Sequence, residues 1–165
     1  MAENVYSALV NEIGAGEKMI FGAEKLAGTA FSVVKDAKLL LRALEGLNKG
    51  TIMTIGVALK LEHLFKRIEL TKDKSANLGI FFSKCANRYG LNELDTGELK
   101  EILELGEKHK KSGFEFSRWG NAIMLDDALG ATKVDSEKLI KLACAGKKLA
   151  ESVKTELERI FQKGI

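Results

Sequence analysis

The stretch LDTGELKEILELGEKHKK (94–111) and the stretch SGFEFSRWGNAIMLDDALG (112–130) that follows it contain the change of hydrophobic period that decides the fold class. Apolar residues in the first recur every three or four positions, as in an amphipathic helix. Asp95 and Glu98 predict a capping box at the start of that helix. In the second stretch apolar and polar residues alternate in single steps, which is typical of a strand buried on one face. The two stretches therefore predict a helix that leads into a β-hairpin at 113–126.

The predicted hairpin contains most of the aromatic residues that bear on function. We expect Phe114 and Phe116 to face the core from a short strand, and the Gly-Asn pair at 120–121 to form the turn before AIML returns as a second strand. Arg118 and Trp119 stand at the end of the first strand. A guanidinium can contact phosphates and an indole can stack on bases, so this pair is a candidate partner-binding site.

The chain before this hairpin has mostly helical spacing. Residues 2–45 predict amphipathic helix, and the small residues near 14–16 indicate either a break or close packing between helices. LEGLNKGT (44–51) is typical of a helix end followed by a loop. TIMTIGVALKLEHLFKRIEL (51–70) is ambiguous. Its middle has helical spacing, whereas its Thr- and Ile-rich beginning and the alternating KRIEL could each form a short strand.

Capping residues place two further helices. Ser75 predicts the start of one helix, and Asp135 predicts the start of the long helix that ends the chain. The fold class is therefore mainly α, a helical domain with a small sheet of two or three strands (α+β). We expect an N-terminal part of amphipathic helices or a helical arm at 1–45, and a compact, mainly helical domain at 46–165.

Composition indicates a folded protein rather than a disordered one. The chain has 165 residues, of which 45% are hydrophobic and 30% charged, and it contains no proline, so helices can run until a glycine or a cap stops them. Cys85 and Cys144 lie in apolar helical patterns, which predicts two buried free thiols. The first residues lack a signal-peptide pattern, and no window reaches the roughly 18 apolar residues of a membrane-spanning helix. We therefore expect a cytoplasmic protein.

Charge is unevenly distributed although the net charge is only +3. Residues 46–91 carry eight basic against three acidic side chains, residues 92–130 carry five against nine, and residues 131–165 carry eight against five. A basic block can bind phosphates, and the alternative is the ordinary solvated face of soluble helices. The candidate phosphate-contacting residues are Lys60, Lys66, Arg67, Lys72, Lys74, Lys84 and Arg88.

Catalytic signatures are not found in the sequence. The acidic residues Glu115, Asp126 and Asp127 are the best candidates for holding a divalent metal, but a carboxylate pair is equally suited to a turn or a helix start. His63 and His109 have no Cys or His at metal-ligand spacing, and His109 lies in EKHKK, which indicates a solvated helix end. We therefore expect a protein that is not an enzyme and that has no cofactor and no metal.

Part of the chain, about residues 20–91, resembles the PcfB-like family, small proteins encoded by conjugative plasmids and integrative elements of Gram-positive bacteria. The resembling features are an N-terminal helix of apolar and small residues, the Lys-Gly pair at 49–50, the KRIEL segment and a helix of the form F-x-x-x-A-x-x-Y-G-L, with Phe82, Ala86, Tyr89, Gly90 and Leu91. The resemblance implies an accessory role in the relaxosome during conjugation, and it brings no catalytic residues.

Two functional hypotheses follow. The first is a non-enzymatic accessory protein of a mobile genetic element that binds nucleic acid or a nucleoprotein complex through the basic residues and the pair Arg118 and Trp119. The alternative is a phage- or plasmid-encoded protein–protein interaction module, such as an inhibitor of a host defence complex or an assembly subunit. In that case the Gly- and Ala-rich N-terminal helices would contact a protein partner, and a homo-oligomer stays open.

Overall fold

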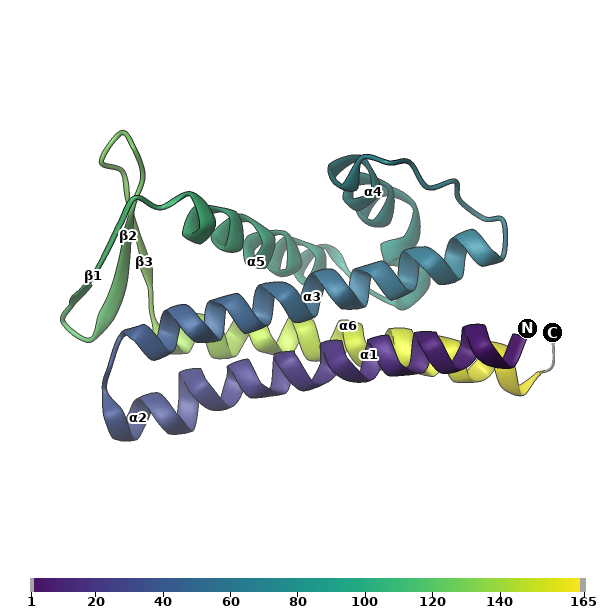
Figure 1. Cartoon of the computed structure of the whole chain (residues 1–165), viewed down its shortest axis with the longest axis horizontal. Coiled ribbons are helices and arrows are strands. Elements are labelled where there is room, and N and C mark those ends of the chain that lie inside the picture. The colour runs from purple at the N-terminus through teal and green to yellow at the C-terminus, as the bar shows by residue number, and fades with distance from the viewer. Residues whose placement is uncertain (1, 164–165) are drawn as a thin grey trace.

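A computed structural model describes residues 2–163 of the chain as a helical bundle that carries a small antiparallel sheet (Figure 1). The prediction of a mainly α fold with a small sheet is confirmed. The elements in chain order are α1 (Ala2–Lys25), the π-helical turn η1 (Leu26–Ala30), α2 (Phe31–Val34), α3 (Lys38–Leu64), α4 (Lys74–Ile80), the π-helical turn η2 (Phe81–Cys85), the 3-10 turn η3 (Ala86–Tyr89), α5 (Glu93–Lys111), β1 (Phe114–Arg118), β2 (Asn121–Leu125), β3 (Ala131–Val134) and α6 (Ser136–Gln162).

The four long helices α1, α3, α5 and α6 run along the long axis of the molecule and alternate in direction in chain order (Figure 1). This is an up-down-up-down arrangement, in which sequential helices are antiparallel neighbours. The short helix α4 and its two turns are inserted between α3 and α5 at one end, and the sheet is inserted between α5 and α6 at the other. Among the described residues, no helix is long and apolar enough to cross a membrane.

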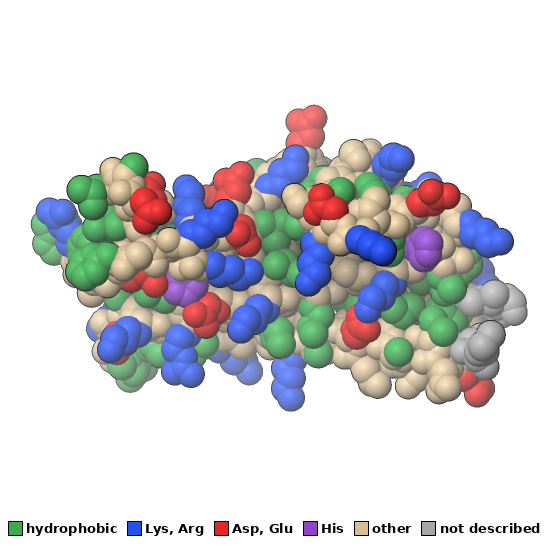
Figure 2. Space-filling model, turned by 45° about the horizontal axis from the view of Figure 1, so that its top comes forward, with side chains coloured by type: hydrophobic (Ala, Val, Ile, Leu, Met, Phe, Trp, Pro, Cys, Tyr) green, Lys and Arg blue, Asp and Glu red, His purple; other side chains and the backbone are tan. Residues whose placement is uncertain are grey.

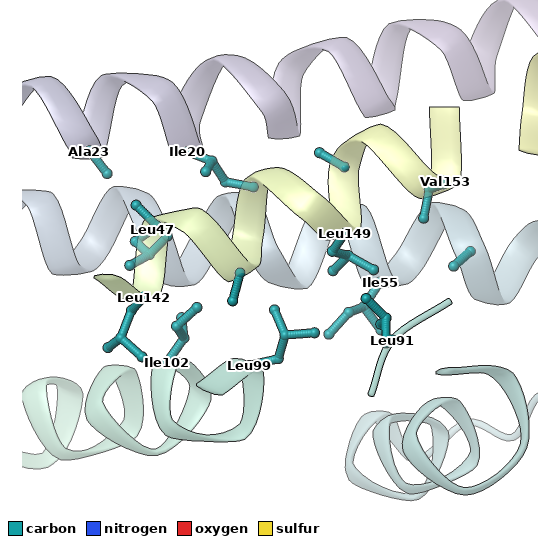
Figure 3. Packing of buried hydrophobic residues seen from close by; sticks show 14 of the residues in the cluster. Ile20, Ala23, Leu47, Ile55, Leu91, Leu99, Ile102, Leu142, Leu149 and Val153 are labelled. Atoms are coloured by element: carbon teal, nitrogen blue, oxygen red, sulfur yellow. The ribbon is translucent and has the colours of Figure 1, made fainter. Parts of the chain in front are cut away.

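One hydrophobic core connects the four long helices (Figure 3). Ile20 on α1, Leu47 on α3, Leu99 on α5 and Leu149 on α6 are each at most 1% exposed. Burial of a leucine or isoleucine side chain contributes about 1.5–3 kcal/mol relative to exposure, so these contacts dominate the stability of the bundle. The boundary expected between residues 45 and 46 falls inside α3, and core residues lie on both sides of it.

The glycines at the crossing of α1 and α3 let the two helices approach closely. A Cβ atom on Gly50 would lie 2.7 Å from the carbonyl oxygen of Gly16, and one on Gly16 would lie 2.8 Å from Oγ1 of Thr54. Of the two interpretations for residues 14–16, close packing is therefore confirmed. The loop expected at 44–51 is wrong, because Gly46 and Gly50 face α1 from inside the continuous helix α3 and do not end it.

The caps of α5 and α4 lie a few residues before the positions predicted from the sequence. The Asn92 side chain accepts a hydrogen bond from the backbone N–H of Asp95 (2.8 Å), and the Asp95 carboxylate accepts one from the N–H of Asn92 (2.9 Å). The capping box is thus Asn92 with Asp95, and the predicted pair of Asp95 with Glu98 is wrong. In α4 the cap is Asp73, whose carboxylate accepts from the N–H of Ser75 (2.9 Å), so Ser75 is not the cap.

The predicted hairpin is confirmed and a third strand extends it. β1 pairs with β2 and β2 with β3, all antiparallel, and α6 then begins at the predicted cap Asp135. Trp119 and Gly120, with φ of 48° and 76°, form the two-residue turn, one position earlier than predicted, because Asn121 already pairs with Arg118. Two positive φ angles in succession are the geometry that matches the twist of a tight hairpin. The segment KRIEL forms no strand and lies in the loop before α4.

Candidate binding surface on the sheet

The aromatic residues of β1 lie on the solvent-facing side of the sheet. Phe114 is 62% exposed and Phe116 is 36% exposed, whereas Met124 on the opposite side is 2% exposed. The prediction that both phenylalanines face the core is therefore wrong. The buried side of the sheet is set by Ala122, Met124 and Val134, and β1 contributes Glu115 and Ser117 to it.

The turn adds a cation and an indole at the end of this surface. Trp119 is 86% exposed, and the guanidinium of Arg118 lies over its ring at 4.4 Å from the centroid. The ring centroids of Phe114 and Phe116 are 5.7 Å apart. Hydrophobic side chains gather over the sheet at the left of Figure 2. We call this surface the outer sheet face, and it consists of Phe114, Phe116, Arg118, Trp119, Ile123 and Leu125.

β1 is also an edge strand. The strand order is β1-β2-β3, so among the described residues β1 has a paired strand on one side only. Because a two-residue turn joins β1 to β2, Arg118 and Asn121 form the hydrogen-bonded pair next to the turn. The backbone groups of Glu115 and Ser117 then point to the unpaired edge. An unpaired edge beside an apolar face is a template on which another strand can pair.

The predicted basic residues do not meet the outer sheet face. Lys60 to Arg88 lie near the end of α3 and around α4, whereas Arg118 and Trp119 lie at the hairpin turn, at the opposite end of the long axis (Figure 1). Lys60 pairs with Glu12 on α1 at 2.7 Å. Ion pairs within residues 2–163 do not include Lys66, Lys72, Lys74 or Lys84, which are exposed.

Two arginines of the basic region are held by a buried carboxylate. Glu62 on α3 is 1% exposed, and it accepts hydrogen bonds from Arg67 (3.2 Å), from Arg88 and from the hydroxyl of Tyr89 (3.2 Å). Burial and the neighbouring Glu62 carboxylate raise the pKa of Tyr89 well above its ordinary value. This cluster ties the loop after α3 to η3, so the guanidinium groups of Arg67 and Arg88 already have a carboxylate partner within the fold.

Only one of the two thiols is buried. Cys85 is fully buried, and burial, followed by the charge of Glu62, raises the pKa of its thiol. Cys144 on α6 is exposed, so its predicted burial is wrong. Its neighbours Ala143 and Ala145 both reach the core, and residue 144 lies between these two positions on the outward side of the helix.

Many of the charged side chains form ion pairs between helices. The acidic side of α5 faces the basic side of α6, and α6 also pairs with α1, for example Lys147 with Glu24 (2.5 Å). The pairs between α5 and α6 are Asp95 with Lys148, Glu98 with Lys141 and Glu101 with Lys138. Basic and acidic side chains are accordingly interspersed over most of the face in Figure 2. Pairs in which both side chains are exposed, such as Lys138 with Glu101, contribute little each, about 0–1 kcal/mol.

His109 links the sheet to the bundle, and sequence reasoning missed it. Its Nδ1 lies 2.7 Å from a Glu115 oxygen and its Nε2 lies 2.8 Å from a Glu45 oxygen. The side chain is 15% exposed, so the expected solvated helix end is wrong at this position. The ring borders a hollow of about 380 Å³ between α3 and α5. The one sequence signal for this contact is the alternation of side chains along β1, which places Glu115 on the side of the sheet that faces the helices.

Two of the three carboxylates considered for a metal site, Glu115 and Asp126, have other partners. Glu115 contacts His109, and Asp126 accepts hydrogen bonds from the backbone N–H groups of Ala128 (2.9 Å) and Gly130 (2.7 Å) in the loop between β2 and β3. Within residues 2–163 no three or more His, Cys, Asp or Glu side chains converge as a metal site. Asp126 therefore shapes a turn, which is the alternative that the sequence left open.

Comparisons of the chain with protein-family models, with curated proteins and with solved structures find no match. The outer sheet face, the unpaired edge of β1 and the contacts behind them therefore carry the functional assignment.

Proposed function

We propose that the protein is a non-enzymatic docking protein that binds an extended segment of a protein partner along β1. The observation that carries this proposal is the exposure of Phe114 and Phe116 on one face of an edge strand, together with that of Trp119 in the turn that follows it. The role agrees with an accessory protein of a mobile genetic element that contacts a nucleoprotein complex through its protein component. The inhibitor or assembly-subunit hypothesis uses the same surface and differs in the identity of the partner.

The chemistry of the outer sheet face favours a protein over a nucleic acid. Ile123 and Leu125 lie beside the aromatic rings and present aliphatic surface. The nearby Lys133 lies 3.7 Å from Asp135. Affinity for nucleic acid comes mainly from cations that neutralise phosphates, and this side of the sheet offers only Arg118 and, opposite Ile123, Lys133. Centres of protein interfaces are instead enriched in aromatic residues and arginine.

The edge and the face together define how the partner would bind. Backbone groups of Glu115 and Ser117 at the unpaired edge supply hydrogen bonds to an added strand, which is the mode of binding known as β-augmentation. Every second side chain of that strand would then lie beside Phe114 and Phe116 and should be apolar. A carboxylate at its end would meet Arg118. The partner segment is therefore an extended, alternating apolar stretch with an acidic end.

The small-residue side of α1 is less suited to a partner, because the molecule itself covers it. Gly16 packs against α3, and Ile13 and Ile20 are at most 1% exposed. The apolar side chains of α1 that stay partly exposed, such as Val10 and Phe21, are 38% and 43% exposed. They lack both the edge and the turn that distinguish β1.

Site-specific photo-cross-linking in the source cell tests the proposal directly. Benzoylphenylalanine in place of Phe116 should give a discrete adduct that survives nuclease and disappears on protease treatment. The same probe in place of Ala76, an exposed residue of α4 at the other end of the molecule, is the matched control and should not give it. Equal adducts at both positions, or an adduct that nuclease removes, would refute docking of a protein at β1.

Paired charge and aromatic variants separate the protein from the nucleic-acid hypothesis. Phe114→Ser with Phe116→Ser should abolish binding of the partner that the cross-link identifies. Lys72→Glu with Lys74→Glu should leave this binding intact. Binding of single-stranded and duplex oligonucleotides is measured in parallel over a salt titration, since phosphate contacts lose affinity steeply with ionic strength. Tight, salt-sensitive DNA binding that the lysine variant loses and the aromatic variant keeps would replace the proposal with nucleic-acid binding through the basic residues.

A further inference from the structure

His109 contacts a carboxylate with each of its ring nitrogens. Nδ1 lies 2.7 Å from Glu115 and Nε2 lies 2.8 Å from Glu45. A neutral imidazole has one N–H, so it could donate to only one of these carboxylates and would turn a lone pair toward the other. Only the imidazolium form donates to both. The arrangement of the three residues therefore holds a proton on the ring.

The three residues belong to three different elements. Glu45 lies on α3, His109 lies near the end of α5, and Glu115 lies on β1. Glu115 pairs across the sheet with the buried Met124, so it reaches His109 from the inner side of the same strand whose outer side carries the two phenylalanines. The charged ring thereby connects the edge strand to two helices of the bundle.

Other charges near the ring oppose the proton but do not outweigh the carboxylates. Lys49 on α3 and Lys110 on α5 border the same hollow, and Lys110 lies 3.5 Å from Glu107 on its own helix. On β2 the neighbour of Glu115 is Met124, which does not titrate. Burial lowers the pKa of His109, but the hydrogen bonds to Glu45 and Glu115 outweigh it, so the pKa is raised above its ordinary value of 6.5.

We propose that His109 is a pH-sensitive clasp that ties β1 to α3 and α5 while its ring is protonated and releases β1 when the proton leaves. Release loosens the strand whose outer side carries Phe114 and Phe116, and it weakens the binding of a partner there. This last step rests on the proposed docking function, whereas the release of β1 does not.

The direction of the pH dependence follows from the raised pKa. A group that binds its proton more tightly in the folded state contributes stability that is fully present below its unfolded pKa. That contribution is lost as the pH rises through the folded pKa. The clasp is therefore closed at acidic and neutral pH and opens in the alkaline direction.

Hydrogen exchange on the full chain tests the release of β1. Exchange of the β1 amides that bond to β2, those of Phe116 and Arg118, should speed up by about tenfold between roughly pH 6 and 9 in the wild type, after correction for the intrinsic effect of pH. Amides in the middle of α3 should show no such change and serve as the internal reference. In His109→Gln, which keeps one donor but cannot carry the charge, β1 exchange should be fast and independent of pH.

A titration of His109 itself completes the test. The His63→Gln background leaves one histidine, whose ring carbon resonance should titrate with a midpoint above 6.5 that coincides with the midpoint of β1 exchange. Glu45→Gln, which removes one of the two carboxylates, should lower both midpoints together. The clasp is refuted if β1 exchange in the wild type does not change with pH, or if His109→Gln and Glu45→Gln keep the wild-type profile.

The effect on binding is read separately from the opening of the strand. The yield of the photo-adduct at position 116 in lysate should fall several-fold between about pH 6 and 9 in the wild type, with no such fall in His109→Gln. The two measurements together distinguish the two proposals. Exchange that depends on pH without any adduct at position 116 refutes the docking function and leaves the clasp, whereas an adduct with exchange independent of pH does the reverse.

Discussion

Replacing Gly50 by alanine should destabilise the protein, although the same change in an open part of a helix should stabilise it. A Cβ atom at residue 50 would lie 2.7 Å from the carbonyl oxygen of Gly16, 2.8 Å from Cγ1 of Ile20 and 3.0 Å from Cβ of Met19. The first of these atoms belongs to the backbone of α1. It can move away only if α1 shifts relative to α3, which would disturb the core that both helices share.

Gly56, which lies nearly two turns further along α3, is the matched control because an added Cβ atom there has nothing within 4 Å. Alanine in a helix is favoured over glycine by about 1 kcal/mol, so Gly56→Ala should stabilise by about 0.5–1 kcal/mol. At Gly50 the same gain is opposed by overpacking, which costs about 1–3 kcal/mol and more where backbone must move. We expect Gly50→Ala to lower the free energy of unfolding by about 1–2 kcal/mol, a difference of roughly 1.5–3 kcal/mol between the two variants.

Urea unfolding followed by far-ultraviolet circular dichroism measures both variants against the wild type. The free energies of unfolding should change in opposite directions, with similar dependence on urea concentration if both remain two-state. If Gly50→Ala stabilises the protein as much as Gly56→Ala does, then α1 and α3 do not cross in close contact at these glycines. The close-packing explanation of the continuous α3 would then fail with it.

Three further predictions follow from single residues. Phe116→Ala should change the free energy of unfolding by less than about 1 kcal/mol, whereas Met124→Ala on the buried side of the same sheet should lower it by about 2–5 kcal/mol in urea unfolding. Glu62→Gln should lower the pKa of Tyr89, read from the absorbance of tyrosinate in an alkaline titration, and cost about 1–3 kcal/mol; an unchanged tyrosine titration would contradict the contact. The hydrogen bond from the ammonium group of Lys148, together with the capping bond from Asn92, lowers the pKa of Asp95. The contribution of the Asp95 carboxylate to stability is therefore present above its ordinary pKa of 3.8 and is lost as the pH falls through the folded pKa. Asp95→Asn should flatten this acid limb of urea midpoints measured at a series of acidic pH values, and a limb as steep as the wild type's would count against it.

Periodicity predicted the sheet and the helices well, but it could not tell which side of β1 is buried. Alternation shows that Phe114 and Phe116 share a face with one another and that Glu115 shares a face with Ser117. Hydrophobicity alone assigns the phenylalanines to the core. In the structure the phenylalanines lie on the outer side, because Met124 of β2 points inward and His109 provides a partner for the carboxylate of Glu115 on the inner side.

The helix end predicted at the glycines of α3 was wrong for a related reason. A glycine near the end of an apolar period is typical of a helix stop, and Gly46 and Gly50 fit that pattern. Whether a glycine ends a helix or allows a second helix to approach depends on what lies opposite. That neighbour is Gly16, more than 30 positions earlier in the chain, and no local pattern connects the two.

The outer side of the sheet is available for binding because the core of the bundle does not depend on it. The helices α1, α3, α5 and α6 already enclose the core, and the sheet adds to it from its inner side through Ala122, Met124 and Val134. Phe114 and Trp119 add little to that core, and exposed aromatic side chains beside an unpaired edge promote aggregation. Fold stability would be served as well by polar residues at these positions. The proposed docking of a partner at β1 would account for the aromatic residues at these positions.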